Sequence, residues 1–217
     1  MADFTLVIGN KNYSSWSLRG WMMLKAAGVA FEEVLVRLSL PTTRTEILKH
    51  APSARVPVLK HGTLVVWETL AIGEYLSELF PSVRLWPEDA AARAVARSAS
   101  AEMHSGFAPL RKHFPMNIRS SFPNRGSTPE VQADIDRITA LWHDCRSRFA
   151  KNGPFLFGGF TIADAMYAPV VTRFRTYKVQ IPSEAQAYCD AVAALPAMQE
   201  WATDAGKEPW IIEDSEF

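Results

Sequence analysis

The stretch Tyr13-Ser14-Ser15-Trp16-Ser17-Leu18-Arg19 follows a short apolar run, residues 4–8, and opens a helical pattern that ends near Ala27-Gly28. This order predicts a strand, a hydroxyl-rich turn and a helix. The first N–H groups and the positive dipole end of a helix favour an anion, and a thiolate is such an anion. Taken alone, however, Ser before an apolar helical run is most often an ordinary N-cap. The rest of the chain is needed to choose between these interpretations.

The bulk composition suits a globular protein of two domains. The chain has 217 residues, of which 48% are hydrophobic and 21% charged. Lys plus Arg equals Asp plus Glu at 23 each, so the formal net charge is zero. Zero net charge gives no support for binding nucleic acid or an anionic membrane, and little repulsion against self-association. We therefore expect no nucleic-acid and no membrane partner.

Cysteine and histidine give no pattern of metal ligands. Cys145 and Cys189 lie far apart and form neither a zinc motif nor a disulfide framework. The five histidines, at positions 50, 61, 104, 113 and 143, show no metal spacing either, so we expect no metal. Free thiols favour a reducing, cytoplasmic setting. The N-terminus lacks a signal-peptide pattern, and no apolar run approaches the ~20 residues of a membrane helix.

Residues 1–80 carry the pattern of a small α/β domain. A second apolar run, 29–36, follows Gly28, which is typical of the position just beyond a helix end. Strand, helix and strand should therefore form a parallel unit with a right-handed crossover. The segment 41–50 is a polar connection that is helical or irregular. A basic run from Arg44 to Lys60, which includes Lys49 and Arg55, has a solvated face as its simplest interpretation, although a small anionic ligand would also suit it.

Two further apolar runs, 55–59 and 63–67, complete the predicted sheet. Pro57 stands near the start of the first run, where a missing N–H is tolerated. The three residues between the runs, 60–62, include a Gly and predict a hairpin, so this pair should be antiparallel. A helix is expected over 68–79. Its inward residues are predicted to be Leu70, Ile72, Tyr75, Leu76 and Leu79.

After a linker at 81–87, residues 88–217 have only helical patterns. Thr161 and Asp164 form a capping-box pair, and Pro169 in the same helix predicts a kink or an early stop. The expected helices cover 90–113, interrupted near Gly106 and Pro109, and 129–150, 161–176, 184–194 and 196–205, with a loop at 115–128 that contains Pro123, Asn124 and Gly126. The fold class is thus a βαβ-ββα domain followed by an all-α domain.

Four short motifs follow one another along the chain, namely the serine turn at 14–19, Val56-Pro57, Glu68-Thr69 and Thr161-Ile162-Ala163-Asp164. In these motifs, and over nearly its full length, the chain resembles a cytosolic glutathione S-transferase. No single motif is specific, but their order and spacing together are. The resemblance implies a thioredoxin-like glutathione-binding domain and a helical domain that contributes the electrophile site. The Ser-Ser-x-Ser-x-Arg turn is most similar to bacterial serine-type members and to the zeta class, which has Cys where Trp16 stands.

The resemblance implies that Ser14 donates a hydrogen bond to the glutathione sulfur, with Ser15 as the second candidate. Tyr13 is a further alternative, because other classes use a Tyr hydroxyl. A hydrogen bond to the charged form, together with a helix N-terminus, lowers the pKa of a thiol and raises the thiolate fraction. The bound tripeptide would then be an activated nucleophile.

The resemblance also implies contacts for the rest of the tripeptide. The Val56 backbone would pair with the cysteinyl residue beside a cis Pro57. Glu68 and Thr69 would hold the γ-glutamyl end. Lys49 or His50 is the candidate cation for the glycyl carboxylate. Each has a simpler alternative, namely a trans strand start, ordinary helix-start residues and a solvated surface.

The electrophile should lie between the domains, with His104, Phe107 and Arg111 as its candidate contacts. Each candidate has a simpler interpretation. Met and aromatic residues at this helical spacing more often belong to the core than to a pocket. A His in an Ala-rich helix more often hydrogen-bonds a neighbouring residue than takes part in catalysis, and an Arg is more often solvated at the surface. The resemblance further implies a homodimer.

The resulting hypothesis is an enzyme, a glutathione transferase of the detoxification type, that uses glutathione to conjugate or isomerise a small hydrophobic electrophile. Peroxide reduction is a third reaction that this hypothesis leaves open. A different hypothesis keeps the fold and loses the catalysis, leaving a ligand-binding or interaction module. A thiol-disulfide oxidoreductase is disfavoured, since no Cys lies near Ser14.

Overall fold

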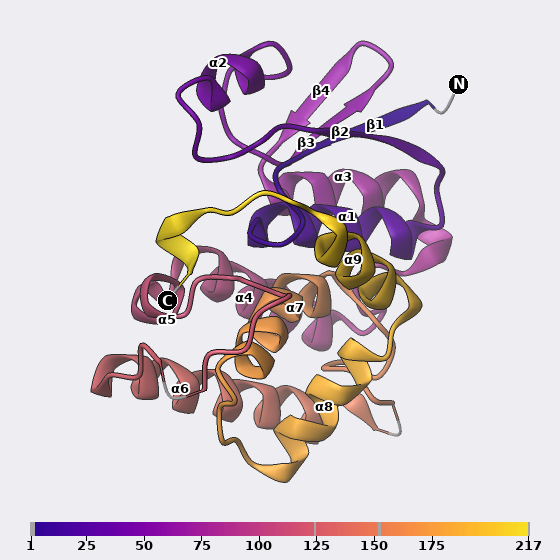
Figure 1. Ribbon diagram of the computed structural model, residues 1–217. Helices are drawn as coiled ribbons and strands as arrows, with labels where there is room; N and C mark the ends of the chain where they lie inside the picture. Colours follow the sequence, from indigo (N-terminus) through magenta and orange to yellow (C-terminus); the bar gives the residue numbers. More distant parts are fainter. Residues whose placement is uncertain (1–2, 124, 152, 217) are drawn as a thin grey trace.

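The computed structural model describes residues 3–123, 125–151 and 153–216. Asn124, predicted to lie in the loop 115–128, falls outside the described residues, as do the first two residues of the N-terminus. Figure 1 shows two layers of different architecture: a sheet with flanking helices built by the first part of the chain, and a bundle of helices built by the rest. This is the predicted thioredoxin-like domain followed by a helical domain. The boundaries at 80 and 88 remain a prediction.

The sheet has the order β2-β1-β3-β4. Its strands are β1 (Phe4–Ile8), β2 (Phe31–Leu35), β3 (Val58–His61) and β4 (Leu64–Trp67). β1 and β2 are parallel and joined through α1 (Ser15–Ala27), while β3 runs antiparallel to both β1 and β4, which confirms the predicted pairing. One detail was wrong. His61 pairs with Leu64, so the hairpin connection is the two residues Gly62-Thr63, and Gly62 takes the positive φ of 57° that such a turn requires.

The sheet is covered on both faces, as the continuous apolar run in β1 predicts. Leu6 and Ile8 pack with α1 and α3 (Thr69–Leu79), whereas Val7 packs on the opposite face in a smaller cluster with α2 (Thr43–Leu48). Figure 1 shows α1 and α3 between the sheet and the helical domain, with α2 away from it. The start of α1 is therefore held between the sheet and the second domain.

In α3 the predicted inward face is confirmed at its centre and wrong at its end. Ile72 and Leu76 are fully buried, and Leu70 and Tyr75 are half-buried against the core. Leu79 is 39% exposed, because the helix ends at this residue and the chain turns directly into η1 (Pro81–Val83).

The second domain is helical, and α7 (Ile162–Thr176) runs through its centre with almost every residue buried. The capping box is present, but Pro169 does not stop the helix, since α7 continues to Thr176 inside a packed core that overrides the local preference. None of the helices among the described residues has the length and apolar character to cross a bilayer. The other elements are α4 (Ala90–Ser105), α5 (Ala108–His113), α6 (Pro129–Cys145), η2 (Arg146–Ala150), α8 (Ser183–Ala193), α9 (Pro196–Lys207) and η3 (Glu213–Ser215).

Candidate active site

A cavity of about 650 Å³ lies at the junction of the two domains. The serine turn, the segment 54–57 and the start of α3 form its wall on the first domain, and the end of α4 forms its wall on the second. This size suits a tripeptide and part of a second small molecule. Its lining residues are Tyr13, Ser14, Ser15, Trp16, Leu38, Thr43, Ile47, Ala54, Arg55, Val56, Pro57, Glu68, Thr69, His104 and Ser105.

The two candidate serines differ in what their hydroxyls contact. Ser14 is the N-cap of α1: its Oγ accepts from the Ser17 N–H at 3.3 Å and donates to Ser17 Oγ at 2.7 Å. Ser17 Oγ in turn accepts from the Gly9 N–H at 2.9 Å, which ties the cap to the end of β1. The Ser15 hydroxyl, at the cavity wall, has no hydrogen-bond partner among the described residues. The N-cap interpretation therefore holds for Ser14, and Ser15 is left with a free hydroxyl.

The start of α3 presents unpaired donors to the same cavity. Its N-cap residue, Glu68, makes no side-chain cap, so the first N–H groups of the helix lack that partner. Thr69 is 1% exposed, and its Oγ1 is buried without a hydrogen-bond partner in the part of the chain that the structure describes. Glu68 itself adopts φ 71°, an unusual backbone for a residue with a side chain, and such outliers gather at functional sites. Unpaired donors at a helix N-terminus are the kind of group that suits an anion.

The Val56-Pro57 peptide bond is cis, as the resemblance implied. Val56 precedes β3, which begins at Val58, so it lies outside the paired part of the strand and on the cavity wall. Its N–H and C=O are thus placed beside the cavity and outside the sheet ladder.

The predicted cations Lys49 and His50 are not among the residues that line the cavity. The Lys49 ammonium pairs with Glu46 at 2.6 Å on the exposed side of α2, and burial, followed by the nearby Lys60 charge, lowers the pKa of His50. Arg55 lines the cavity instead. The sequence predicted Arg55 only as part of a basic run. Its place directly before Val56 was a signal that it would lie near the cavity.

The wall on the second domain, at the end of α4, lies against Trp16 of α1. His104 lies edge-on to the Trp16 ring at 5.1 Å, and its Nε2 is 3.8 Å from Glu68. Phe107 and Arg111 do not line the cavity. Arg111 donates to the carbonyl oxygens of Met103, His104 and Gly106 at the end of α4, and its guanidinium lies 4.8 Å from the Trp16 ring, so it contacts the cavity wall at His104 and Trp16.

Tyr13 borders the cavity, but its hydroxyl is engaged elsewhere. It donates to Glu216 at 2.6 Å and accepts from Arg119 at 2.7 Å, both of which belong to the second domain and the chain end. Burial, followed by the bond to Glu216, raises the pKa of Tyr13. These contacts make Tyr13 the least available of the three candidate hydroxyls.

The described residues contain no group of three His, Cys, Asp or Glu side chains that could hold a metal ion. Cys145 and Cys189 are buried in α6 and α8, and burial raises the pKa of each thiol to about 12. Neither thiol reaches the cavity.

Comparison with known proteins identifies the family of both domains. The family description "Glutathione S-transferase, N-terminal domain" matches residues 13–79, and "Glutathione S-transferase, C-terminal domain" matches residues 93–204, more than half of the chain.

Individual relatives and solved structures are consistent with this family. A maleylacetoacetate isomerase of Rattus norvegicus is 29% identical over 172 residues, 77% of this chain and 76% of that protein. A probable maleylacetoacetate isomerase of Caenorhabditis elegans is 38% identical over 96 residues, 44% of each chain. Among solved structures, a glutathione transferase homolog from Burkholderia with bound glutathione has a TM-score of 0.71 at 24% identity, covering 93% of this chain and 97% of that one, a likeness of fold. The chain therefore belongs to the glutathione S-transferase family.

Proposed function

We propose that this chain is a glutathione transferase that binds glutathione in the cavity at the domain junction and activates its thiol there. The observation that carries the proposal is the convergence of unpaired donors on one cavity. The Ser15 hydroxyl, the uncapped start of α3 and the buried Thr69 hydroxyl all lack partners among the described residues. Buried polar groups without partners are uncommon, so a polar, anionic ligand is the expected partner.

In the proposed mechanism, Ser15 donates its hydroxyl proton in a hydrogen bond to the glutathione sulfur and keeps that proton. The N-terminus of α1 adds its positive dipole end. Both effects stabilise the thiolate over the thiol, so the thiol pKa falls and the nucleophilic fraction at neutral pH rises. Ser14 acts through the helix cap, by holding the turn that carries Ser15. Ser14 itself, placed on the same wall, is the alternative donor.

The remaining contacts orient the tripeptide. The γ-glutamyl carboxylate suits the start of α3 and Thr69, and its ammonium suits the Glu68 carboxylate. The cysteinyl backbone would pair with Val56 in the manner of an added strand. For the glycyl carboxylate we propose Arg55 in place of Lys49 or His50, because Arg55 is the one of these three that lines the cavity.

The second substrate would lie against Trp16, His104 and Ser105, beside the sulfur position. In conjugation the thiolate forms a C–S bond with an electrophilic carbon, and a leaving anion departs or a proton is added. In isomerisation the thiolate adds to a conjugated double bond, the adjacent bond rotates, and the thiolate is expelled. Similarity to two maleylacetoacetate isomerases and to the zeta-class turn supports the isomerase reaction.

We also propose that the chain forms a homodimer. Leu64 and Trp67 on β4 and Leu79 at the end of α3 are each more than one third exposed, and β4 is the edge of the sheet. A second copy would cover this apolar surface. Sedimentation velocity of the wild type and of Trp67→Glu tests this assembly.

The proposal is tested by titrating glutathione into the protein in a calorimeter and then assaying halogenated aromatics, maleyl compounds and organic peroxides. Binding with turnover of one of these classes is expected. Binding without turnover of any of them would favour the non-catalytic module, and failure to bind glutathione at millimolar concentration would refute the proposed function.

A further inference from the structure

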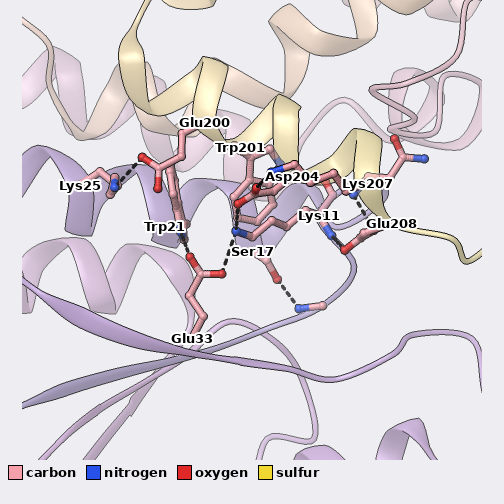
Figure 2. Close-up of polar contacts among 12 residues, drawn as sticks. Lys11, Ser17, Trp21, Lys25, Glu33, Glu200, Trp201, Asp204, Lys207 and Glu208 are labelled. Carbon is pink, nitrogen blue, oxygen red and sulfur yellow. Dashed lines mark hydrogen bonds and ion pairs between the residues drawn. The ribbon is translucent and has the colours of Figure 1, made fainter. Parts of the chain in front are cut away.

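The last helix and the chain end hold the segment that leads into the serine turn. Lys11 lies three residues before Ser14, and each of its polar groups is bonded to this part of the chain. Its backbone N–H donates to Glu208 at 2.6 Å, its carbonyl accepts from Trp201 Nε1 at 2.9 Å, and its ammonium donates to Asp204 at 2.9 Å. Figure 2 shows these residues grouped around Lys11.

The partners of the Lys11 backbone are buried, so these two bonds are formed in a region shielded from water, whereas the Asp204 side chain is 37% exposed. Trp201 is fully buried, Glu208 is 8% exposed, and the Lys11 side chain is 8% exposed. The Lys11 ammonium also pairs with Glu33 of β2 at 2.8 Å and lies 5.3 Å from the Trp201 ring. Charge-assisted bonds of this kind are shorter and stronger than bonds between neutral groups.

The Glu208 carboxylate binds backbone N–H groups, so it fixes the main chain of this segment as well as its side chains. Its second oxygen accepts from the Asn12 N–H at 3.1 Å, so one carboxylate fixes two successive peptide N–H groups. The turn then continues through Asn10, whose carbonyl accepts from the N–H groups of Tyr13 and Ser14 at 3.1 and 2.8 Å. A shift at Lys11 or Asn12 is therefore passed on to the serines.

We propose that Glu208 and Trp201 are positioning residues for the serine turn: they set its backbone, and through it they set where the Ser15 hydroxyl meets the glutathione sulfur. This inference rests on the proposed function. Neither residue lines the cavity, so any effect on the bound thiol must pass through the turn.

The decisive variant is Glu208→Gln, which keeps the side-chain size but leaves one oxygen to accept. Its amide nitrogen would face a backbone N–H, so one of the two bonds is lost. The matched control is Glu200→Gln. Glu200 also joins α9 to the first domain, through Lys25 of α1 at 2.6 Å (Figure 2), but it touches no backbone group of the turn.

The readout is the pKa of the glutathione thiol bound to each full-length variant, measured from the pH dependence of thiolate absorbance. We expect Glu208→Gln to raise this pKa by about one unit, a tenfold loss of thiolate, with a smaller change in glutathione affinity, and Glu200→Gln to leave it unchanged. Trp201→Phe, which keeps an aromatic ring and removes the N–H, should act in the same direction and decides the question if Glu208→Gln does not fold.

Equal pKa values in wild type and in the folded variants would overturn the inference, as would an equal rise in Glu200→Gln. A second readout separates this outcome from failure of the proposed function. Amide hydrogen exchange of residues 10–15, measured without glutathione, should quicken in Glu208→Gln and stay the same in Glu200→Gln. If the wild-type bound thiol has an ordinary pKa, thiol activation is refuted, and hydrogen exchange alone then supports or overturns the positioning role.

Discussion

Replacing Ser15 by Ala should raise the pKa of the bound glutathione thiol, while glutathione affinity changes little. The Ser15 hydroxyl has no other partner among the described residues, so its removal takes nothing from the free protein except a donor at the cavity wall. A hydrogen bond to a charged group contributes about 1.5–3 kcal/mol. Because one pKa unit equals about 1.4 kcal/mol, the thiol pKa should rise by about one to two units.

Ser14→Ala provides the comparison, because it removes the hydroxyl one residue earlier. Its bonds to Ser17 close the N-terminus of α1, and loss of an N-cap destabilises a protein by about 1 kcal/mol. For a chain of this size the melting temperature should fall by about 2–4 °C. The thiol pKa should rise less than in Ser15→Ala, since the donor to the sulfur remains and only its support is weakened.

The pKa of the bound thiol and the melting temperature can be measured in the same samples, the first from thiolate absorbance against pH and the second from thermal unfolding. At a pH below the thiol pKa, turnover by Ser15→Ala should fall by about 10- to 100-fold and recover as the pH rises. The reverse pattern, with a large pKa rise in Ser14→Ala and none in Ser15→Ala, would refute the division of roles. No rise in either would show that neither hydroxyl stabilises the thiolate.

Three further perturbations test other parts of the site and the fold. Thr69→Val should leave the free protein as stable as wild type or slightly more so, because it removes a buried unpaired hydroxyl, and it should weaken glutathione binding by about tenfold in calorimetry. Arg55→Ala should raise the KM for glutathione by about 10-fold, whereas Lys49→Ala, which breaks only an exposed pair with Glu46, should leave it unchanged. Burial raises the pKa of Asp164 from 3.8 to about 6, so the folded protein binds more protons than the unfolded chain between these values. This group should therefore lower the free energy of unfolding by up to about 3 kcal/mol as the pH rises from 4 to 6, a slope that denaturant titrations of Asp164→Asn should lack.

The sequence was sufficient for features set by neighbouring residues. Alternation and apolar runs gave the strands, a Gly placed the end of α1, and the Thr161–Asp164 pair predicted a cap in which the Asp164 carboxylate accepts from the Thr161 N–H at 2.8 Å. These signals work because each is an interaction within one turn or one strand. The predicted hairpin length was wrong because strand register depends on which residue of the other strand lies opposite, and neither strand alone shows this.

Features set by distant residues were not accessible in this way. Glu46 and Lys49 are three residues apart, so their ion pair is a local feature, but no local pattern indicates that Arg55 lines the cavity. The chain end from Glu208 to Glu216 carries no motif, yet it holds residues 11–13 across nearly 200 positions of sequence. Such contacts arise only when the two domains are packed together.

The serine turn also explains why two interpretations of one stretch were both reasonable. A helix start attracts an external anion most strongly when its backbone is held in one position, because a mobile terminus spreads its dipole over many positions. In α1 the Ser14–Ser17 pair closes the helix and ties it to β1, which leaves Ser15 between them with a free hydroxyl. The cap is thus a condition for the proposed thiolate site, and the two interpretations apply to different atoms of the same turn.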